Sequence, residues 1–238
     1  GGDSFSRLTK RDGTGQYSIP HGDWVEDVAF SPDGSWYATV SDDNMVRVVE
    51  TASGKEMIRM AHSGFVQKVD VSNDGKWIAA TGYDQVVRIW DAASGSLMLE
   101  FPLKANGSAI SFNQDASRIV AADESGAIFI RDLSSLSARV NYIEFTEFAH
   151  EAQFTPSGDS LIVNTDDYRV WKIPADEVDQ IHDGTSGEAI LRTQSLTYDQ
   201  AISPDSKWAA VVEFDNVNPQ FNKATLVNLQ DESSYPLD

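Results

Sequence analysis

The chain of 238 residues contains no cysteine. Disulfide bonds and thiolate metal sites are therefore excluded. Basic residues are scarce as well, because 18 Lys and Arg stand against 37 Asp and Glu, which gives a formal net charge of −19. Since phosphate backbones and anionic lipids need basic side chains to neutralise them, this balance argues against binding to nucleic acid or to a membrane surface.

Long apolar runs are also missing, and no basic segment followed by an apolar one opens the sequence. The chain thus offers no candidate membrane span and no signal peptide, and we expect a cytoplasmic protein. The Gly-x-Ser-x-Gly, His-Glu-x-x-His and phosphate-loop motifs are absent too. The sequence therefore predicts no catalytic centre, cofactor or metal site.

What the sequence does contain is a repeat of 41 residues. Gly34 and Gly75 occupy matching turns, and Trp36 and Trp77 begin matching apolar segments. Each copy has four short alternating segments rich in Val, Ile and aromatic residues, separated by clusters of Gly, Asp, Asn and Ser. Such segments are typical of β-strands, and a period of about 40–45 residues with four strands per copy is typical of a β-propeller blade.

The copies resemble the WD-repeat β-propellers, and the bacterial type in particular. The segments that carry the resemblance are Phe30–Gly34, Ser41–Asn44, Tyr83–Asp91 and the histidines that precede the first strands, His21 and His62. The resemblance implies four-stranded antiparallel blades, usually seven to a ring. It also implies a sensor or docking domain of the kind that bacteria often fuse to a signalling domain in a longer protein.

We expect a single all-β propeller domain with five to six blades' worth of chain, either closed alone or part of a seven-bladed ring. Closure as five blades would place 16–19 beside 224–229. The insertion 174–184 resembles a short helix, since it has Pro at its start, acids in its first turn and Gly after its end. The expected blades are a half blade at 3–20 and copies at 24–60, 65–101, 107–145, 149–197 and 198–238.

In the family, each blade is often tied by a hydrogen-bonded set of His, Ser or Thr, Asp and Trp. The resemblance assigns this structural role to residues of two copies, and neither set is complete. The copy after His21 has Val49 in place of the tryptophan, and the copy after His62 has Ala80 in place of the hydroxyl. The residues assigned are His21, Thr39, Asp43, His62, Asp84 and Trp90.

Acidic residues occupy the turns between second and third strands, often in pairs. One aspartate per turn has a structural role, because its carboxylate accepts hydrogen bonds from turn N–H groups. The second acid is not needed for that, so Asp42, Glu124 and Asp166 form a negative rim. This rim either steers a basic protein partner or only keeps the protein soluble.

Four aromatic residues lie beside the same turns: Trp24, Phe65, Tyr83 and Phe148. Aromatic rings within a polar rim are common anchors of a protein interface. The alternative is that Trp24 and Phe65 fill the core between blades.

The function that follows is a non-catalytic protein-interaction, scaffold or sensor module that presents an acidic loop face to a partner. One alternative is a propeller enzyme or small-molecule binder that uses the mouth of the central channel. Another is an excised or engineered fragment that self-associates through open blade edges. The polar groups available to the channel alternative are Glu26, Asp27, Lys68, Ser108, Ser111 and Gln153.

Overall fold

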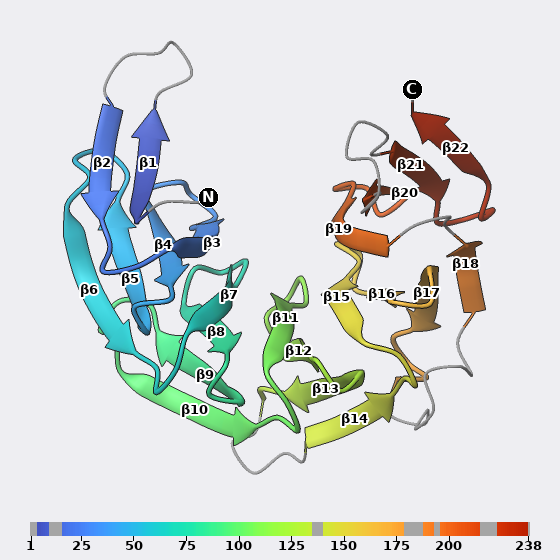
Figure 1. The fold of residues 1–238 in the computed structure, drawn as a ribbon, viewed down its shortest axis with the longest axis horizontal. Coiled ribbons are helices and arrows are strands. Elements are labelled where there is room, and N and C mark those ends of the chain that lie inside the picture. The colour runs from blue at the N-terminus through green and yellow to red at the C-terminus, as the bar shows by residue number, and fades with distance from the viewer. Residues whose placement is uncertain are drawn as a thin grey trace. The chain divides into compact units, whose positions relative to one another are not determined.

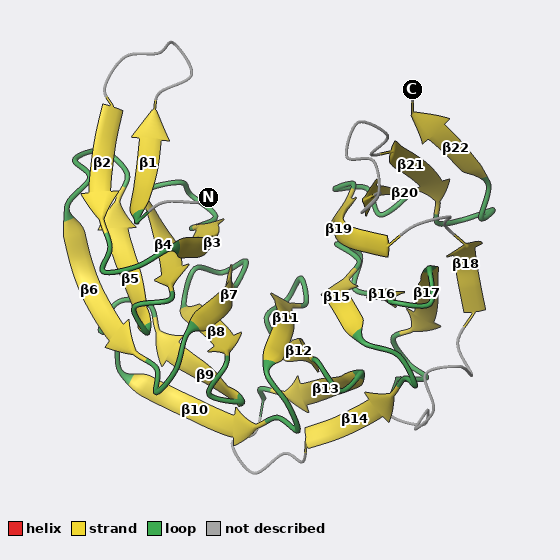
Figure 2. Cartoon of the chain, in the orientation of Figure 1, coloured by secondary structure: helices red, strands yellow, loops and turns green. Residues whose placement is uncertain are grey.

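The structure is a computed structural model that describes residues 4–9, 16–134, 140–178, 188–192, 196–214 and 223–237. Every regular element in these ranges is a β-strand (Figure 2), which agrees with the predicted all-β fold class. The described residues therefore contain no helix that could cross a membrane. The strands form five four-stranded sheets and one two-stranded sheet, and the chain divides into two compact units, Gly1–Ile110 and Ser111–Asp238.

The first unit holds the two-stranded sheet and two four-stranded sheets (Figure 1). Within each four-stranded sheet, consecutive strands pair antiparallel in chain order, which is the topology of a propeller blade. The strands are β1 (Phe5–Thr9), β2 (Gln16–Pro20), β3 (Val25–Phe30), β4 (Trp36–Ser41), β5 (Met45–Glu50), β6 (Glu56–Ala61), β7 (Val66–Val71), β8 (Trp77–Gly82), β9 (Val86–Asp91) and β10 (Leu97–Pro102).

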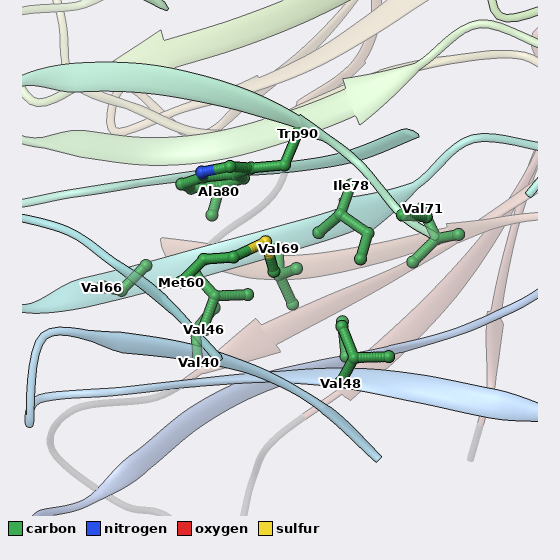
Figure 3. Close-up of a cluster of buried hydrophobic side chains, with 12 residues drawn as sticks. Val40, Val46, Val48, Met60, Val66, Val69, Val71, Ile78, Ala80 and Trp90 are labelled. Carbon is green, nitrogen blue, oxygen red and sulfur yellow. The ribbon is translucent and has the colours of Figure 1, made fainter. Parts of the chain in front are cut away.

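The core of the first unit lies between its two four-stranded sheets. Strands β4 and β5 contribute alternate valines, and β7 to β9 contribute residues that include Ile78 and Trp90 (Figure 3). Alternation sends every second side chain to this layer, which is why the period-2 pattern predicts the core. Burial of one such Val or Ile side chain contributes about 1.5–3 kcal/mol, so this layer fixes the two sheets against each other.

The second unit contains the remaining sheets, and its first sheet includes β11, which spans the boundary between the units. A buried cluster that includes Ile162, Val170, Val211 and Val227 joins its last two sheets. The strands are β11 (Gly107–Phe112), β12 (Arg118–Asp123), β13 (Ala127–Asp132), β14 (Val140–Glu144), β15 (Ala149–Phe154), β16 (Ser160–Thr165), β17 (Arg169–Pro174), β18 (Glu188–Arg192), β19 (Leu196–Ile202), β20 (Trp208–Phe214), β21 (Lys223–Asn228) and β22 (Ser234–Leu237).

Two predictions about the chain path are wrong. The segment expected to start a helix at 174 instead ends β17, where the Ala175 N–H donates to the carbonyl of Asp159 and a turn follows. The rest of that insertion, from 179 on, lies outside the described residues. Closure through 16–19 beside 224–229 also fails, because β21 is already paired on both edges, with β20 and β22.

Candidate protein-interaction surface at the strand turns

The turns between second and third strands share one backbone conformation. Their last residue has a positive φ in four sheets: 69° at Asn44, 60° at Gln85, 84° at Gly126 and 64° at Tyr168. This left-handed residue reverses the chain tightly, so the residues before it lie at one end of each sheet. The turn therefore fixes the backbone positions of the predicted residues that lie within it, which are Asp42, Tyr83, Glu124 and Asp166.

In the first four-stranded sheet, the turn is held by Asp43. Its carboxylate accepts hydrogen bonds from the backbone N–H of Gly22, at 2.7 Å, and of Met45, at 3.1 Å. The guanidinium of Arg47, four residues later, donates to both oxygens, with Nη1 at 3.0 Å from Oδ1. Burial alone would raise the pKa of Asp43, but the hydrogen bonds from Arg47 and Gly22 hold it below its usual value. The carboxylate thus stays charged and keeps the turn closed.

The second sheet repeats this arrangement at Asp84. One carboxylate oxygen, Oδ2, lies 3.0 Å from His62 Nδ1 and accepts a hydrogen bond from the Ser63 N–H, also at 3.0 Å. The Arg88 guanidinium donates to the same oxygen. Burial acts to raise the pKa of Asp84, yet the hydrogen bonds from His62 and Arg88 outweigh it and hold the pKa far below the ordinary value.

Three of the predicted aromatics of the first unit lie at the surface. Trp24 is 56% exposed, Phe65 44% and Tyr83 47%. The rings of Phe65 and Tyr83 are in contact, with centroids 5.9 Å apart. Backbone bonds fix their places, because the Phe65 carbonyl accepts from the Tyr83 N–H and the Trp24 carbonyl accepts from the Asp42 N–H. The alternative that Trp24 and Phe65 fill the core between blades is therefore wrong.

The rim acid Asp42 has a structural contact that the sequence did not indicate. Its Oδ1 accepts a hydrogen bond from the side-chain amide of Gln67 on the neighbouring sheet, at 3.0 Å. Burial, together with the nearby carboxylates of Asp23 and Asp43, raises the pKa of Asp42. The expectation that the fold makes no use of this acid is thus wrong, although the carboxylate remains partly exposed.

The second unit brings together two of the predicted residues and adds a third. The Phe148 carbonyl accepts from the Asp166 N–H, and the Asp166 carboxylate makes a close hydrogen bond with His150 Nε2. The Phe148 ring lies edge-on to the His150 ring, with centroids 4.4 Å apart. Asp166 is therefore a paired acid, while Glu124 lies exposed in the turn before Gly126.

The residues predicted to tie the blades have mixed roles. Thr39 is fully buried, but its hydroxyl has no hydrogen-bond partner among the described residues. Trp90 meets His62 through an edge-on ring contact, with centroids 5.4 Å apart. The His62 Nε2 atom is buried and has no hydrogen-bond partner in the described part of the chain.

Sequence reasoning missed four residues that position this surface: Arg47, Arg88, Gln67 and His150. The two arginines had a signal, because each follows a turn aspartate by four residues and the pair is separated by the repeat length of 41. The repeat contains no comparable signal for Gln67 or His150. Their contacts depend on side chains that differ from one copy to the next.

Polar groups elsewhere are engaged in the structure. Asp27, proposed for the channel alternative, accepts a hydrogen bond from the Val69 N–H at 3.1 Å.

The second unit has an open cleft of about 440 Å³. It lies at the end of the sheets opposite to the turns described above, and there the Lys172 ammonium donates to the Leu229 carbonyl at 2.6 Å. In the described ranges, no group of three acidic or histidine side chains is arranged to hold a metal ion.

Comparison with known proteins gives one match. Residues 14–50 and 55–91 each match the WD40 family, described as WD domain, G-beta repeat. No curated protein sequence matches the chain. The matched segments run from β2 to β5 and from β6 to β9, so the two repeats lie within the first unit and include the turns that carry Asp43 and Asp84.

Proposed function

We propose that the chain is a protein-interaction module of a signalling or scaffold protein, and that the turn end of the first unit binds a basic protein segment. Repeats of the WD40 type generally mediate protein–protein contacts. The observation that carries the proposal is the exposure of Trp24, Phe65 and Tyr83 at the same end of two packed sheets, beside the carboxylate of Asp42.

Exposed rings beside acids suit a partner with alternating basic and apolar side chains. Aromatic side chains supply most of the contact energy at interface centres, and individual anchors contribute about 2 kcal/mol or more. The acids contribute mainly to association rate and to selection against acidic partners. A partner of this kind binds more weakly as the salt concentration rises, because exposed charges are screened.

The first experiment locates the contact. A photo-crosslinking phenylalanine analogue is placed at Tyr83 and, as the control, at Tyr142, which is similarly exposed in the second unit. Both proteins are irradiated with an array of peptides that carry alternating Lys or Arg and apolar residues. We expect adducts at position 83 and none at position 142, and equal labelling at the two positions contradicts the proposal.

The second experiment measures the contributions of the ring and of the acid to affinity for the peptide that crosslinks. Trp24→Ala should weaken binding at least tenfold. Asp42→Asn should weaken it a few-fold and reduce its salt dependence. The control is Asp91→Asn, which removes one negative charge at the end of the second sheet opposite to the Asp84 turn. If Asp42→Asn and Asp91→Asn give the same salt dependence, the acidic face is not the binding surface.

A further inference from the structure

The cleft of the second unit lies where the first unit carries bulky apolar side chains. Ser160, the first residue of β16, and Lys172 of β17 both line it. In the strand register, Ser160 corresponds to Trp36 of the first four-stranded sheet, and Lys172 corresponds to Val48. Both project to the same side as Ile162, which packs against the last sheet. The cleft therefore lies at the contact between the last two sheets.

In the first unit, the same place is filled. Trp36 packs against the buried cluster between the two four-stranded sheets, which contains Val48 of one sheet and Ile78 of the next (Figure 3). In the second unit, a serine in place of the tryptophan removes the volume of an indole ring, and a lysine in place of the valine introduces a cation. The cleft is therefore a consequence of two changed repeat positions.

Contacts between the last two sheets fix the frame of the cleft. The Ser157 N–H donates to the Ser206 hydroxyl at 2.7 Å, which joins the turn before β16 to the turn before β20. The hydrogen bond from Lys172 to the Leu229 carbonyl joins β17 to the residue that follows β21. All four residues line the cleft, so its shape is set by the packing of the two sheets.

The two carboxylates that line the cleft are held by their own turns. Asp159 accepts a hydrogen bond from the Thr155 hydroxyl at 2.7 Å. Burial acts to raise the pKa of Asp159, but hydrogen bonds from neighbouring hydroxyls and the charge of Lys172 hold it below its usual value. A hydrogen bond from the Ser203 hydroxyl, at 2.7 Å, lowers the pKa of Asp205. Both acids are therefore ionised, and they limit the negative charge that the cleft can accept.

Lys172 is less completely engaged than these acids. Its ammonium has three N–H groups, and within the described residues its hydrogen bond goes to the Leu229 carbonyl. The ion pairs in the described part of the second unit do not include Lys172. The side chain is partly exposed in the cleft, so it can donate further hydrogen bonds to an acceptor from solution.

A carboxylate is the acceptor that suits this position. One lysine balances one negative charge, while Asp159 and Asp205 repel a second, which disfavours a phosphate dianion. Hydroxyl groups and the amide of Gln230 supply much of the remaining lining, and an apolar ligand would leave such groups without hydrogen bonds. The volume of about 440 Å³ falls within the range of about 300–1,000 Å³ that is usual for small-molecule sites.

We propose that this cleft binds a small hydroxylated carboxylate of the sugar-acid class, with its carboxylate on the Lys172 ammonium and its hydroxyl groups among the side chains of Ser157, Ser206 and Gln230. The site belongs to the second unit. It does not depend on the protein-binding surface proposed for the first unit, and either can fail without the other.

The first test titrates the chain with three sugar acids, glucuronate, galacturonate and gluconate, by calorimetry. Glucose and glucose 6-phosphate are the matched probes, because they differ from glucuronate only in the group at the sixth carbon. We expect at least one acid to bind in the millimolar range or better, and both matched probes to bind at least tenfold more weakly. Failure of all three acids overturns the proposal, and so does equal or tighter binding of glucose or glucose 6-phosphate.

The second test changes the cleft itself. Lys172→Ile introduces the residue that the second and third four-stranded sheets have at this position, Ile89 and Ile130, and should abolish binding. Ser160→Trp should also abolish it, because the ring fills the cleft. The control is Lys207→Ile, which removes the same charge beside Asp205 and should leave affinity unchanged. Binding by Lys172→Ile at the original affinity contradicts the proposal.

The third test needs no substitution, so it decides the matter even where a variant fails to fold. An N-hydroxysuccinimide ester of acetic acid acetylates lysines, and peptide mass spectrometry gives the rate at each position in one sample. The sugar acid that binds should slow acetylation of Lys172 several-fold and leave Lys207 unchanged, whereas glucose should slow neither. Equal effects at the two lysines, or none at Lys172, overturn the assignment of the site.

Discussion

The two four-stranded sheets of the first unit contain the same buried charges and connect them differently. In both, a turn aspartate accepts hydrogen bonds from an arginine four residues later, and that arginine approaches the histidine before the sheet. In the second sheet, His62 also lies within hydrogen-bond distance of Asp84. In the first sheet, His21 lies between Arg47 and the Ser6 hydroxyl of β1.

The difference shows that the repeat fixes the aspartate and the arginine, whereas the neighbouring strand decides what the histidine does. His21 has both ring nitrogens engaged because β1 supplies Ser6. His62 has one buried ring nitrogen, Nε2, without a hydrogen-bond partner in the described residues. Each sheet therefore has a buried polar atom without a hydrogen-bond partner in the described residues. In the first sheet it is the Thr39 hydroxyl, and in the second it is the Nε2 atom of His62.

The largest effect is expected from Asp84→Ala. The substitution leaves two buried groups, the Arg88 guanidinium and the His62 ring, without their common carboxylate. Removal of one partner from a buried charged pair costs about 3–5 kcal/mol, so we expect the free energy of unfolding in urea to fall by about 3 kcal/mol. Asp43→Ala should cost less, because it leaves no histidine without its carboxylate partner.

The control for this prediction is Asp91→Ala, at an exposed turn of the second sheet, which should change the free energy of unfolding far less than Asp84→Ala does. Tryptophan emission can follow the unfolding, and Trp90, which packs against His62, is one of the six tryptophans that contribute to it. If Asp84→Ala lowers the free energy of unfolding no more than Asp91→Ala does, the hydrogen bonds of Asp84 with His62 and Arg88 do not stabilise the turn.

The second prediction concerns pH. Burial, with Arg47 beside the ring, lowers the pKa of His21 from 6.5 to about 4. The unfolded chain therefore binds a proton at this residue before the folded chain does, so stability falls as the pH drops from 6.5 towards 4. We expect a loss on the order of 1–2 kcal/mol over this window, measured by urea unfolding at several pH values.

His21→Asn should remove the fall in stability between pH 6.5 and 4. The loss of stability at still lower pH should remain. The lowered pKa of Asp84 places its own contribution below the ordinary aspartate value of 3.8, so the two windows are distinct. If the His21→Asn protein keeps the same slope between pH 6.5 and 4, another group titrates in this range.

Much of the fold could be predicted from the sequence because its signals are local. The period of 41, the alternation of apolar residues and the turn residues specify four-stranded sheets without reference to any distant contact. The turn aspartates could be predicted for the same reason, since Asp43 and Asp84 accept hydrogen bonds from the backbone N–H groups of Gly22 and Ser63, which occupy the same repeat position.

The remaining features depend on which side chains meet between sheets. Val28 and Val69 occupy the same repeat position, and only the strands laid against them make one exposed and the other buried. The contacts of Asp42 with Gln67 and of Asp166 with His150 each join a turn residue to a strand residue, and these side chains vary between copies. A single sequence carries no signal for such pairs.

The third prediction concerns the unsatisfied hydroxyl of the first sheet. Thr39→Val replaces a buried hydroxyl that has no partner in the described residues by a methyl group of similar size. We expect the free energy of unfolding to rise by about 1 kcal/mol, because the desolvation penalty of the hydroxyl disappears.

Thr81→Val in the second sheet is the matched control. Its hydroxyl is equally buried but donates to the Val86 carbonyl at 3.2 Å, so its loss should lower stability by about 1 kcal/mol. Opposite signs for the two substitutions would establish that hydrogen bonding separates the two sites. The same sign for both would refute this reasoning.

The smallest effect is expected from Ala80→Ser, which would make the second sheet more like the complete family pattern. Ala80 pairs with Arg88, so its side chain projects to the side where Arg88 meets His62, and it lies in one cluster with Trp90 (Figure 3). If the serine hydroxyl bonds to the buried His62 nitrogen, the free energy of unfolding should rise by about 0.5–1 kcal/mol. Ala79→Ser adds the same hydroxyl to the opposite side and should lower stability by about 1 kcal/mol. Equal losses for both serines would show that the histidine nitrogen is out of reach.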